Sequence, residues 1–402
     1  MEVKAGYKQT EVGFIPEEWE VCRVGSKGEV VTGKALAANA PGKQRPYLRT
    51  KNVFDGRIDI EDVLTMPMTD DQFVQFGLRH GDVLLNEGQS LELVGRCAMY
   101  QGEYPEACAI QNQLIRFRAK AGVSGVFASH VFRHCQQSGV FARIALQTTS
   151  IAHLGGSRFQ RLLLAWPKSE LEQRAIATAL SDVDALLGAL NRLIAKKRDI
   201  KQAAMQQLLT GKTRLPGFHD NWEVKTVAEL EKLKLVKLSR GQVISKKDID
   251  NTPGDFPIYS SSIHNNGLFG RYGKFMFDEE LITWSVDGGG NFFHRRKHKF
   301  SVTNVCGFMR VDTARIDYRF FAAELQLLHS RKSFDYQSKA HPSVVRKEYE
   351  VQLPPRFEQS AIAKVLTDMD AELAALEHRL EKTRALKQGM IQELLTGRTR
   401  LV

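Results

Sequence analysis

The sequence predicts an α+β protein in which two globular domains of mixed α/β structure are joined by two long helices that pair as an antiparallel coiled coil. Three observations predict this fold: an internal repeat, a heptad spacing of apolar residues in each copy, and an unrelated block before each copy. Residues 172–215 and 358–401 are identical at 24 of 44 positions without a gap. The same order of segments therefore occurs twice. The expected segments are a first domain over 1–165, a first helical segment over 166–213, a second domain over 214–352 and a second helical segment over 353–402.

Length and composition restrict the class of protein. At roughly 150 residues per domain, 402 residues agree with two domains and their helices. The 57 Lys and Arg residues exceed the 46 Asp and Glu residues, and a net charge of +11 favours a polyanionic partner, most often nucleic acid. Five cysteines without a CxxC pair indicate neither a disulfide framework nor a zinc site and are typical of the reducing cytoplasm. Because no long apolar run or signal peptide is present, we expect a cytoplasmic protein with no membrane association.

Each copy of the repeat predicts one helix of about 40 residues. Ser169 and Glu172 form a capping box at the first start, and Gly211 and Gly397 are suited to the two ends. Apolar residues follow one another at alternating spacings of four and three, which is the seam of a coiled coil and requires a partner helix. We expect the two seams to pack on each other antiparallel, related by a pseudo-two-fold axis. The seam residues are Ile176, Leu180, Val183, Leu187, Leu190 and Ile194 in the first copy, and Ile362, Leu366, Met369, Leu373, Leu376 and Leu380 in the second.

The two ends of the chain complement each other. The first copy of the repeat continues into Gly217-Phe218, but the second stops at the end of the chain. A similar Gly13-Phe14 lies near the N-terminus, so the N-terminus supplies what the C-terminus lacks. The repeat is therefore expected to be circularly closed, with the two termini close together.

The blocks that precede the helices show mixed secondary structure. Alternating apolar residues and turn-forming glycines predict strands, and longer amphipathic stretches predict helices. In the first block we expect strands over 82–85, 94–100 and 113–117 and a helix over 124–138; in the second, a strand over 280–284, a loop over 287–291 and a helix near 317–331.

Both blocks carry basic residues interleaved with polar and aromatic ones. Lys and Arg neutralise phosphates, whereas Arg, Asn and Gln can also contact base edges in the major groove. Such a cluster is equally consistent with a solvated face, but its recurrence in both blocks of a basic protein favours DNA. The residues predicted to contact DNA are Lys34, Lys43, Arg45, Arg49, Lys51, Asn52, Gln89, Ser90, His153, Tyr259, Ser261, Asn291, Arg295, Arg296, Lys297, Lys339 and His341.

No catalytic or metal-binding set is identified. Gly211-Lys212-Thr213 is similar to the end of a P-loop, but Gln206 stands where a glycine is required, and the segment follows a helix. Gly288-Gly289-Gly290 lacks the dinucleotide-binding pattern. His153 and His341 recur at matching positions without a paired base or acid, so a structural or phosphate-contact role is favoured over nucleophilic catalysis.

Several motifs together resemble one known family over the whole chain. They are Gly13-Phe14-Ile15-Pro16-Glu17-Glu18-Trp19, both Glu-Gln-x-Ala-Ile-Ala helix starts, both Leu-Leu-Thr-Gly-Lys/Arg-Thr-Arg-Leu helix ends, Tyr47-Leu48-Arg49-Thr50-Lys51-Asn52-Val53, and Phe256-Pro257-Ile258-Tyr259-Ser260-Ser261-Ser262. With these motifs the chain resembles the DNA-specificity (S) subunits of type I restriction–modification systems.

The resemblance implies a function without catalysis in this chain. Two target recognition domains would each recognise one half of a bipartite, asymmetric site in double-stranded DNA, and the helices would set the gap between the halves. Two methylation subunits and two restriction subunits would bind to the chain. S-adenosylmethionine, ATP and Mg would be needed only by these partners, so this chain would hold no cofactor.

The alternative function is the recognition subunit of a related two-subunit (type IIB-like) restriction–methylation enzyme, which the sequence does not distinguish from the first. A single-chain nuclease or methyltransferase would need a motif that is not found, and an RNA-binding adaptor would not need the paired helices.

Overall fold

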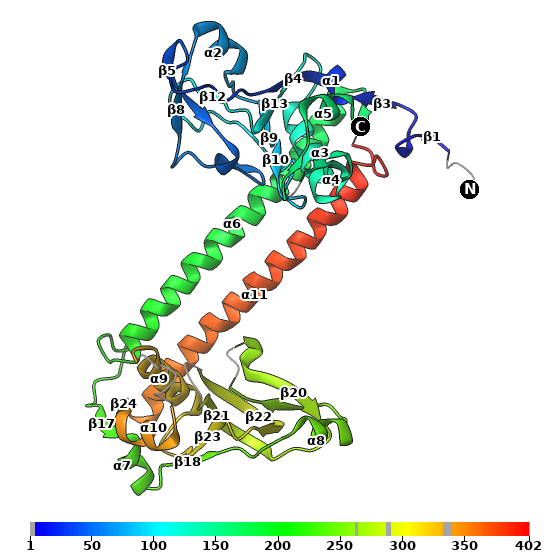
Figure 1. Ribbon diagram of the computed structural model, residues 1–402. Coiled ribbons are helices and arrows are strands. Elements are labelled where there is room, and N and C mark those ends of the chain that lie inside the picture. The colour runs from blue at the N-terminus through cyan, green and yellow to red at the C-terminus, as the bar shows by residue number, and fades with distance from the viewer. Residues whose placement is uncertain (1–4, 149, 262–263, 287–290, 333–339, 402) are drawn as a thin grey trace. The chain divides into compact units, whose positions relative to one another are not determined.

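The computed structural model describes residues 5–148, 150–261, 264–286, 291–332 and 340–401 (Figure 1). Contacts divide the chain into two compact units. The first unit comprises Met1–Ala189 and Leu380–Val402, and the second comprises Leu190–Arg379. Strands and helices occur in both units, so the predicted α+β class is confirmed. The division falls within the long helices because each end of a helix packs on the strands nearest to it, and the domain boundaries at the helix ends stay a prediction.

Several small sheets form the body of the first unit. A four-stranded antiparallel sheet has the order β11-β9-β13-β4, and a three-stranded sheet has the order β12-β5-β8, with β12 parallel to β5. Their strands are β4 (Gly28–Thr32), β5 (Lys43–Leu48), β8 (Leu64–Met68), β9 (Val83–Asn86), β11 (Cys97–Met99), β12 (Ala109–Ile110) and β13 (Leu114–Ala119). Shorter strands are β6 (Val53–Phe54), β7 (Arg57–Ile58), β10 (Gly88–Gln89), β14 (Leu146–Gln147) and β15 (Ala152–His153).

An aromatic core joins the four-stranded sheet of the first unit to its helices. Phe117 of β13 packs edge-on against Phe132 of α3 at 5.0 Å between ring centroids, and Phe132 packs at 5.0 Å against Phe159 of α5. All three side chains are fully buried. The helices are α1 (Val24–Lys27), α2 (Asp70–Phe76), α3 (Gly125–Gln137), α4 (Val140–Ile144) and α5 (Gly156–Arg161), with a 3₁₀ turn over Thr50–Asn52. The predicted helix over 124–138 is thus confirmed as α3, capped by Ser124.

One six-stranded sheet, of order β18-β23-β21-β22-β19-β20, forms the body of the second unit. Only the β19–β22 pair within this described sheet is parallel. The strands are β18 (Val236–Arg240), β19 (Phe256–Tyr259), β20 (Leu268–Tyr272), β21 (Phe277–Ser285), β22 (Phe292–Val302) and β23 (Cys306–Val311). The helices are α7 (Val227–Lys232), α8 (Lys246–Asn251), α9 (Tyr318–Ser330) and α10 (Pro342–Glu348).

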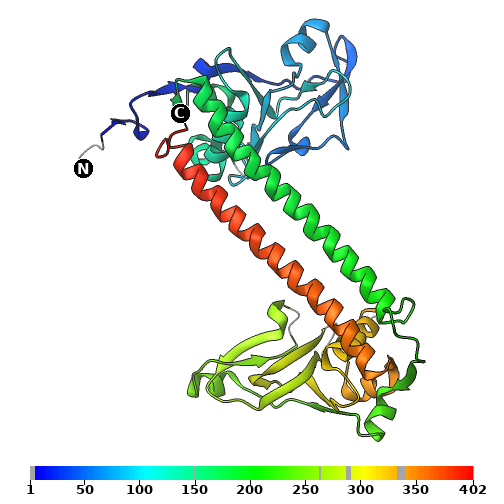
Figure 2. The same cartoon turned by 180° about the vertical axis from the view of Figure 1, so that it is seen from behind.

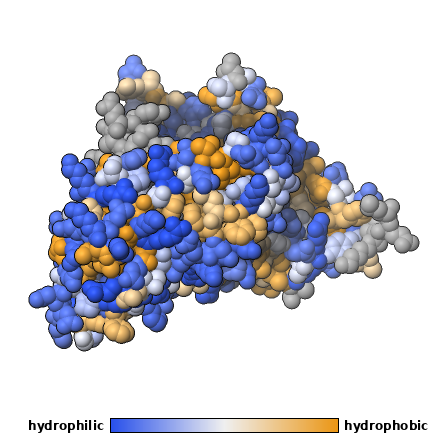
Figure 3. Space-filling view, turned by 90° about the horizontal axis from the view of Figure 1, so that it is seen from below, coloured by the Kyte–Doolittle hydropathy of each residue, from blue (hydrophilic) through white to orange (hydrophobic). Residues whose placement is uncertain are grey.

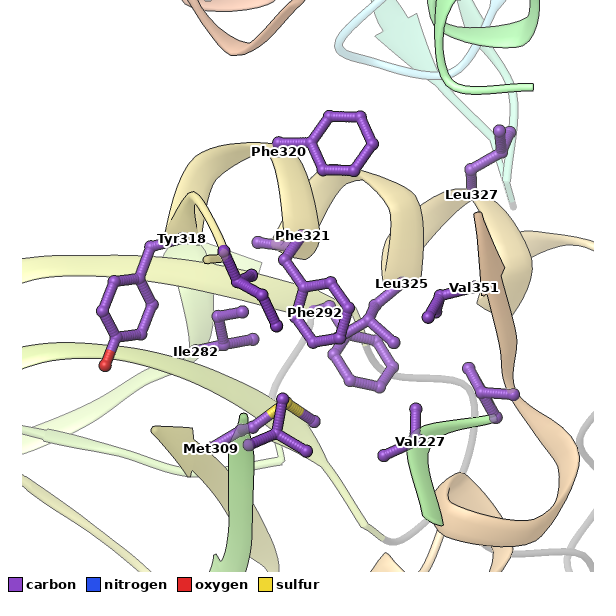
Figure 4. Packing of buried hydrophobic residues seen from close by; sticks show 14 of the residues in the cluster. Val227, Ile282, Phe292, Met309, Tyr318, Phe320, Phe321, Leu325, Leu327 and Val351 are labelled. Carbon is purple, nitrogen blue, oxygen red and sulfur yellow. The ribbon is translucent and has the colours of Figure 1, made fainter. Parts of the chain in front are cut away.

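Helix α9 covers one face of this sheet. Figure 4 shows Phe321 and Leu325 of α9 directed towards Ile282 and Phe292 of the sheet, whereas Phe320 points to the opposite side of the helix. There the Phe320 ring lies 6.4 Å from that of Trp222, in the segment that leads into the unit. The predicted strand over 280–284 and helix near 317–331 are confirmed. Most of the predicted loop over 287–291 lies outside the described residues.

The same strand pairing occurs once in each unit. In the first unit β3 (Trp19–Arg23) pairs antiparallel with β16 (Leu163–Pro167). In the second, β17 (Glu223–Thr226) pairs antiparallel with β24 (Glu350–Leu353). In both cases a lead-in strand pairs with the strand that directly precedes a long helix, so the internal repeat corresponds to a repeated structure.

The predicted circular closure is confirmed within the first unit. The lead-in hairpin of β1 (Tyr7–Thr10) and β2 (Gly13–Pro16) lies at the end of α11. The Tyr7 hydroxyl donates hydrogen bonds to the carbonyl oxygens of Gly397 at 2.9 Å and Arg398 at 3.0 Å. Figures 1 and 2 show strand β1 near the C-terminal end of the last long helix.

Each copy of the repeat forms one uninterrupted helix, α6 (Glu170–Leu208) and α11 (Arg356–Leu394). In the second unit, Lys197 pairs with Glu372 at 2.7 Å, and Lys201 pairs with Asp370. Because later residues of α6 meet earlier residues of α11, the pairing there is antiparallel. In the first unit, Asp184 pairs with Lys387 at 2.5 Å in the same sense.

The predicted seam faces inward. Ile176, Leu180, Leu190, Ile194, Ile362, Leu366, Leu373 and Leu380 are buried, and Val183, Leu187, Met369 and Leu376 are half-buried. Within the described ranges, every helix is too short or too polar to span a lipid bilayer. On the face drawn in Figure 3, hydrophilic residues cover most of the surface and separate the hydrophobic ones into patches.

Candidate nucleic-acid interface

The basic cluster of the first unit lies around β5 and the turn that follows it. Lys34 is exposed, and Arg45 pairs with Asp70 at 2.8 Å. Arg49 and Lys51 share Asp62, at 2.7 and 2.6 Å. Lys43 also lies 3.8 Å from Asp70. The hydrogen bond from Lys51 holds the pKa of Asp62 below its ordinary value. Exposed pairs of this kind are weak, so their cations can exchange an aspartate for a phosphate.

Asn52, predicted to contact DNA, is instead an internal part of this turn. Its side chain is 2% exposed. The Oδ1 atom accepts a hydrogen bond from the Arg49 backbone at 2.9 Å, and Nδ2 donates to the carbonyl oxygens of Asp59 and Asp62 at 2.9 and 3.0 Å. The amide group therefore shapes the loop that presents Arg49 and Lys51 and leaves no exposed face for DNA.

Three further candidates meet on a small sheet of the first unit. Strand β15 lies between β10 and β14, which places His153 opposite Gly88 and beside Gln89 and Ser90. The Nδ1 atom of His153 lies 3.0 Å from a carboxylate oxygen of Glu87. Ser90 is exposed, whereas Gln89 and His153 are half-buried. The structure thus brings together residues that are separated by more than 60 positions.

In the second unit, Arg296 and Lys297 are exposed but Arg295 is not. A shift of register between β21 and β22 places Leu281 opposite Arg295 and Glu279 opposite His298. Arg296 and Lys297 occupy the resulting bulge, so both point outward and the usual alternation is broken. Arg295 is 6% exposed, and burial lowers its pKa. Its predicted role as a surface contact is not supported, because the side chain lies inside the domain.

The remaining candidates of the second unit have mixed surroundings. The Tyr259 hydroxyl lies 3.1 Å from Nε2 of His298, and Ser261 is half-buried. Asn291 accepts a hydrogen bond from the Gln326 amide at 3.1 Å. His341 is exposed and caps α10. Lys339 lies outside the described residues.

A buried carboxylate lies at the start of each long helix. The sequence places Glu172 in a capping box with Ser169, but the pairing of its carboxylate with distant residues, and the role of Glu358, were not predicted. Glu358 is fully buried and accepts two hydrogen bonds from Arg214, at 2.6 and 2.7 Å, and one from the Trp222 indole at 3.1 Å. In the first unit, Glu172 is paired in the same way with Arg400 and Trp19. The glutamate and the arginine are identical in the two copies of the repeat, and this identity was the feature of the sequence that could have indicated their role.

A glutamine follows this glutamate in each repeat, and its hydrogen bonds link the start of a helix in the domain to the long helix. Gln173 accepts a hydrogen bond from the backbone of Ser124, the cap of α3, at 2.9 Å, and donates to the Pro167 carbonyl at 2.9 Å. Gln359 accepts from the backbone of Asp317, the cap of α9, at 2.9 Å. It donates to the Pro354 carbonyl at 2.8 Å. The two units therefore attach different sheets to the long helices with the same set of contacts.

The part of the chain that the structure describes holds no group of three or more His, Cys, Asp or Glu residues that could bind a metal ion. Cys97, Cys108, Cys135 and Cys306 are buried as free thiols, and Cys22 is half-buried. Burial raises the pKa of Cys108 to about 12, which keeps this thiol protonated and unreactive.

The sequence is similar to those of known proteins. A family model described as the type I restriction modification DNA specificity domain matches residues 219–384. The chain is 24% identical, over 98% of its length and 97% of the relative's, to a putative type I restriction enzyme MjaX specificity subunit of Methanocaldococcus jannaschii. It is 44% identical to the putative type I specificity subunit S.MpnORF289P N-terminus of Mycoplasma pneumoniae, over 22% of this chain and 49% of that one.

Solved structures share the fold. The S subunit of a type I restriction–modification system from M. genitalium superposes with a TM-score of 0.60 at 17% identity, over 98% of both chains. The HsdS subunit of Thermoanaerobacter tengcongensis gives a TM-score of 0.52 at 15% identity, over 95% of this chain and 98% of that one. The chain therefore carries a type I restriction modification DNA specificity domain over residues 219–384, and over almost its whole length it is similar to type I specificity subunits in sequence and in fold.

Proposed function

We propose that each unit recognises one half of a bipartite, asymmetric site in double-stranded DNA, while the long helices set the gap and bind two methylation and two restriction subunits. The observation that carries this proposal is that the contacts of Glu172 and Gln173 in the first unit recur at Glu358 and Gln359 in the second, although the sheets of the two units differ. Equal contacts at the two helix starts provide equal positions for two copies of one partner. Unlike sheets provide two different recognition surfaces.

Exposed cations supply the contacts to the DNA backbone. Lys34, Lys43 and Lys51 in the first unit and Arg296 and Lys297 in the second all reach solvent. Contacts to phosphates fix the position and register of a protein on DNA, whereas sequence is recognised at the base edges. The chain itself performs no chemistry in this proposal, and S-adenosylmethionine, ATP and Mg are used by its partners.

Sequencing the methylated bases of a host that carries this chain with its partner subunits tests the recognition. We expect one motif with two different half-sites and a constant gap. An uninterrupted motif, or methylation by the purified chain alone, would contradict the proposal.

The helix starts offer matching positions for the methylation subunits. Leu171 of α6 and Phe357 of α11 occupy the same position of the repeat and are 80% and 85% exposed. A large apolar side chain with this exposure is suited to a protein interface.

The stoichiometry of the complex tests this docking. In native mass spectrometry with the methylation subunit, we expect two copies on the wild-type chain, one on Leu171→Glu or Phe357→Glu, and none on the double variant. Val74→Glu is the matched control, because Val74 is 72% exposed on α2, outside the repeat. Two copies on the double variant would exclude these positions.

A further inference from the structure

The turn His264–Gly267, which directly precedes β20, holds two exposed asparagines in a left-handed backbone conformation. Asn265 has φ 48° and ψ 40°, Asn266 has φ 53° and ψ 32°, and Gly267 follows with φ 79°. Of the other non-glycine residues in the described ranges, Lys234 alone has a positive φ. Two successive non-glycine residues in this region are uncommon and persist only where the surroundings hold them.

Buried side chains of the sheet hold this turn. The Ser260 backbone donates a hydrogen bond to the Gly267 carbonyl at 2.9 Å and closes the turn at its base. Nη2 of Arg295 donates to the Asn266 carbonyl at 2.6 Å, and Nε donates to the Thr283 hydroxyl at 2.9 Å. A buried guanidinium is thereby used to fix the backbone of an exposed turn.

Aromatic rings fix the guanidinium in turn. Its carbon lies 3.7 Å from the ring centroid of Tyr259 and 4.6 Å from that of Phe293. Among the described residues, none supplies a carboxylate within salt-bridge distance of Arg295. Stacking on two rings and two hydrogen bonds to neutral oxygens therefore stabilise the charge, and one of these hydrogen bonds depends on the position of the turn.

The side chains of the turn are available to a partner. Asn265 and Asn266 are exposed, and no other described residue forms a hydrogen bond with either side-chain amide. Strand β20 is the edge strand of the sheet and pairs antiparallel with β19, so the two strands form a ribbon, and the turn lies at its end. Phe269 of β20 is 58% exposed beside the turn.

We propose that this ribbon enters the major groove, that Asn265 and Asn266 recognise adenine in the half-site of the second unit, and that Arg295 is the positioning residue that holds them. This inference rests on the proposed function. The major groove admits a two-stranded ribbon, and an asparagine amide matches the N6 donor and N7 acceptor of adenine. Phe269 is suited to contact the methyl group of the paired thymine. Arg271 and Lys274, both exposed, lie on or next to β20, where they can contact phosphates.

Selection from a pool of randomised DNA duplexes tests the inference, with the full chain in complex with its methylation subunit. Asn265→Gly and Asn266→Gly remove each amide while keeping a residue that accepts positive φ. Each variant should reduce the preference for adenine at one position of one half-site by roughly tenfold and leave the other half-site unchanged. Asn251→Gly is the control, because Asn251 is an exposed asparagine of the same unit at the end of α8.

The role of Arg295 is tested in the same selection. Arg295→Met should remove the adenine preference of this half-site, and Arg295→Lys should restore part of it, because lysine can still donate to the Asn266 carbonyl. If Arg295→Met unfolds the unit, Asn265→Gly and Asn266→Gly still test the inference, because both asparagine side chains are exposed and their removal should not unfold the unit.

The possible outcomes distinguish a failure of this inference from a failure of the proposed function. If the wild-type complex selects no sequence, the proposed function fails. If it selects a bipartite site and both glycine variants retain the wild-type preference for adenine, the assignment of the turn is overturned.

Discussion

At the scale of single residues, buried charges mark the junctions between the domains and the long helices. Glu358 has no exposed surface, and a carboxylate taken out of water requires a partner in good geometry. Arg214 meets it with two nearly equal hydrogen bonds, and Trp222 adds a third. The same three residue types recur at Glu172, so each helix begins at a charge that only distant residues neutralise.

Removing the arginine should destabilise the second unit strongly. We expect Arg214→Ala to lower the free energy of unfolding clearly more than an exposed pair does, because it leaves a buried carboxylate without its cation. Arg174→Ala is the control: Arg174 pairs with Glu170 on an exposed helix surface, and such pairs contribute about 0.5 kcal/mol. Urea unfolding measures both, and equal losses would contradict the assigned role of Glu358.

A second buried carboxylate makes stability depend on pH. Glu324 of α9 is 3% exposed, and burial raises its pKa to about 7. Between pH 4.5 and 7 the folded chain keeps a proton that the unfolded chain releases, so this group favours folding at low pH and the contribution is lost as the pH rises. Glu324→Gln, which stays neutral, should lack this loss.

The comparison is between two pH values. From pH 5 to pH 8, the wild-type chain should lose up to roughly 3 kcal/mol of unfolding free energy relative to Glu324→Gln. Urea titrations at both values measure the difference. An identical pH dependence in the two proteins would show that Glu324 is ionised in the folded chain.

Among the secondary-structure elements, the two long helices each bury one apolar face, the seam, and expose the neighbouring faces. Ile194 is 4% exposed, whereas its neighbour Leu193 is 39% exposed. The spacing of four and three places Ile194 on the face that meets α11 within the second unit and leaves Leu193 outside it. The ion pairs from Lys197 and Lys201 flank the same face.

A charged residue in the seam should therefore lower the free energy of unfolding more than a charged residue beside the seam. Ile194→Asp buries a carboxylate without a partner and should lower the unfolding free energy by roughly 3 kcal/mol or more. Leu193→Asp should cost less than about 1 kcal/mol. Circular dichroism during thermal unfolding compares the two neighbours, and similar melting temperatures would argue against a buried seam.

At the scale of the whole molecule, helix length is expected to set the gap in the DNA site. Seven residues lengthen an α-helix by about 10 Å, which corresponds to about three base pairs at roughly 3.4 Å each. A heptad preserves the seam, so insertions after Ala189 and after Arg379 lengthen both helices in register.

With both insertions, methylated-base sequencing should return the same two half-sites with a gap about three base pairs longer. An insertion in α6 alone should abolish assembly, because it shifts one seam against the other. An unchanged gap with both half-sites retained would show that the helices do not determine the spacing.

The two long helices and their seam could be predicted from the sequence, because they depend on periodicity and on identity between the repeats. The lead-in segments could be matched to each other in the same way, but their strands were not predicted. Tertiary structure decided which candidates reach the surface. Asn52 and Arg295 lie in basic, polar stretches but are buried, one by the folding of its turn and the other by a change of register between β21 and β22. Burial of a polar side chain is set by distant strands and their pairing, and spacing along the chain carries no information about either.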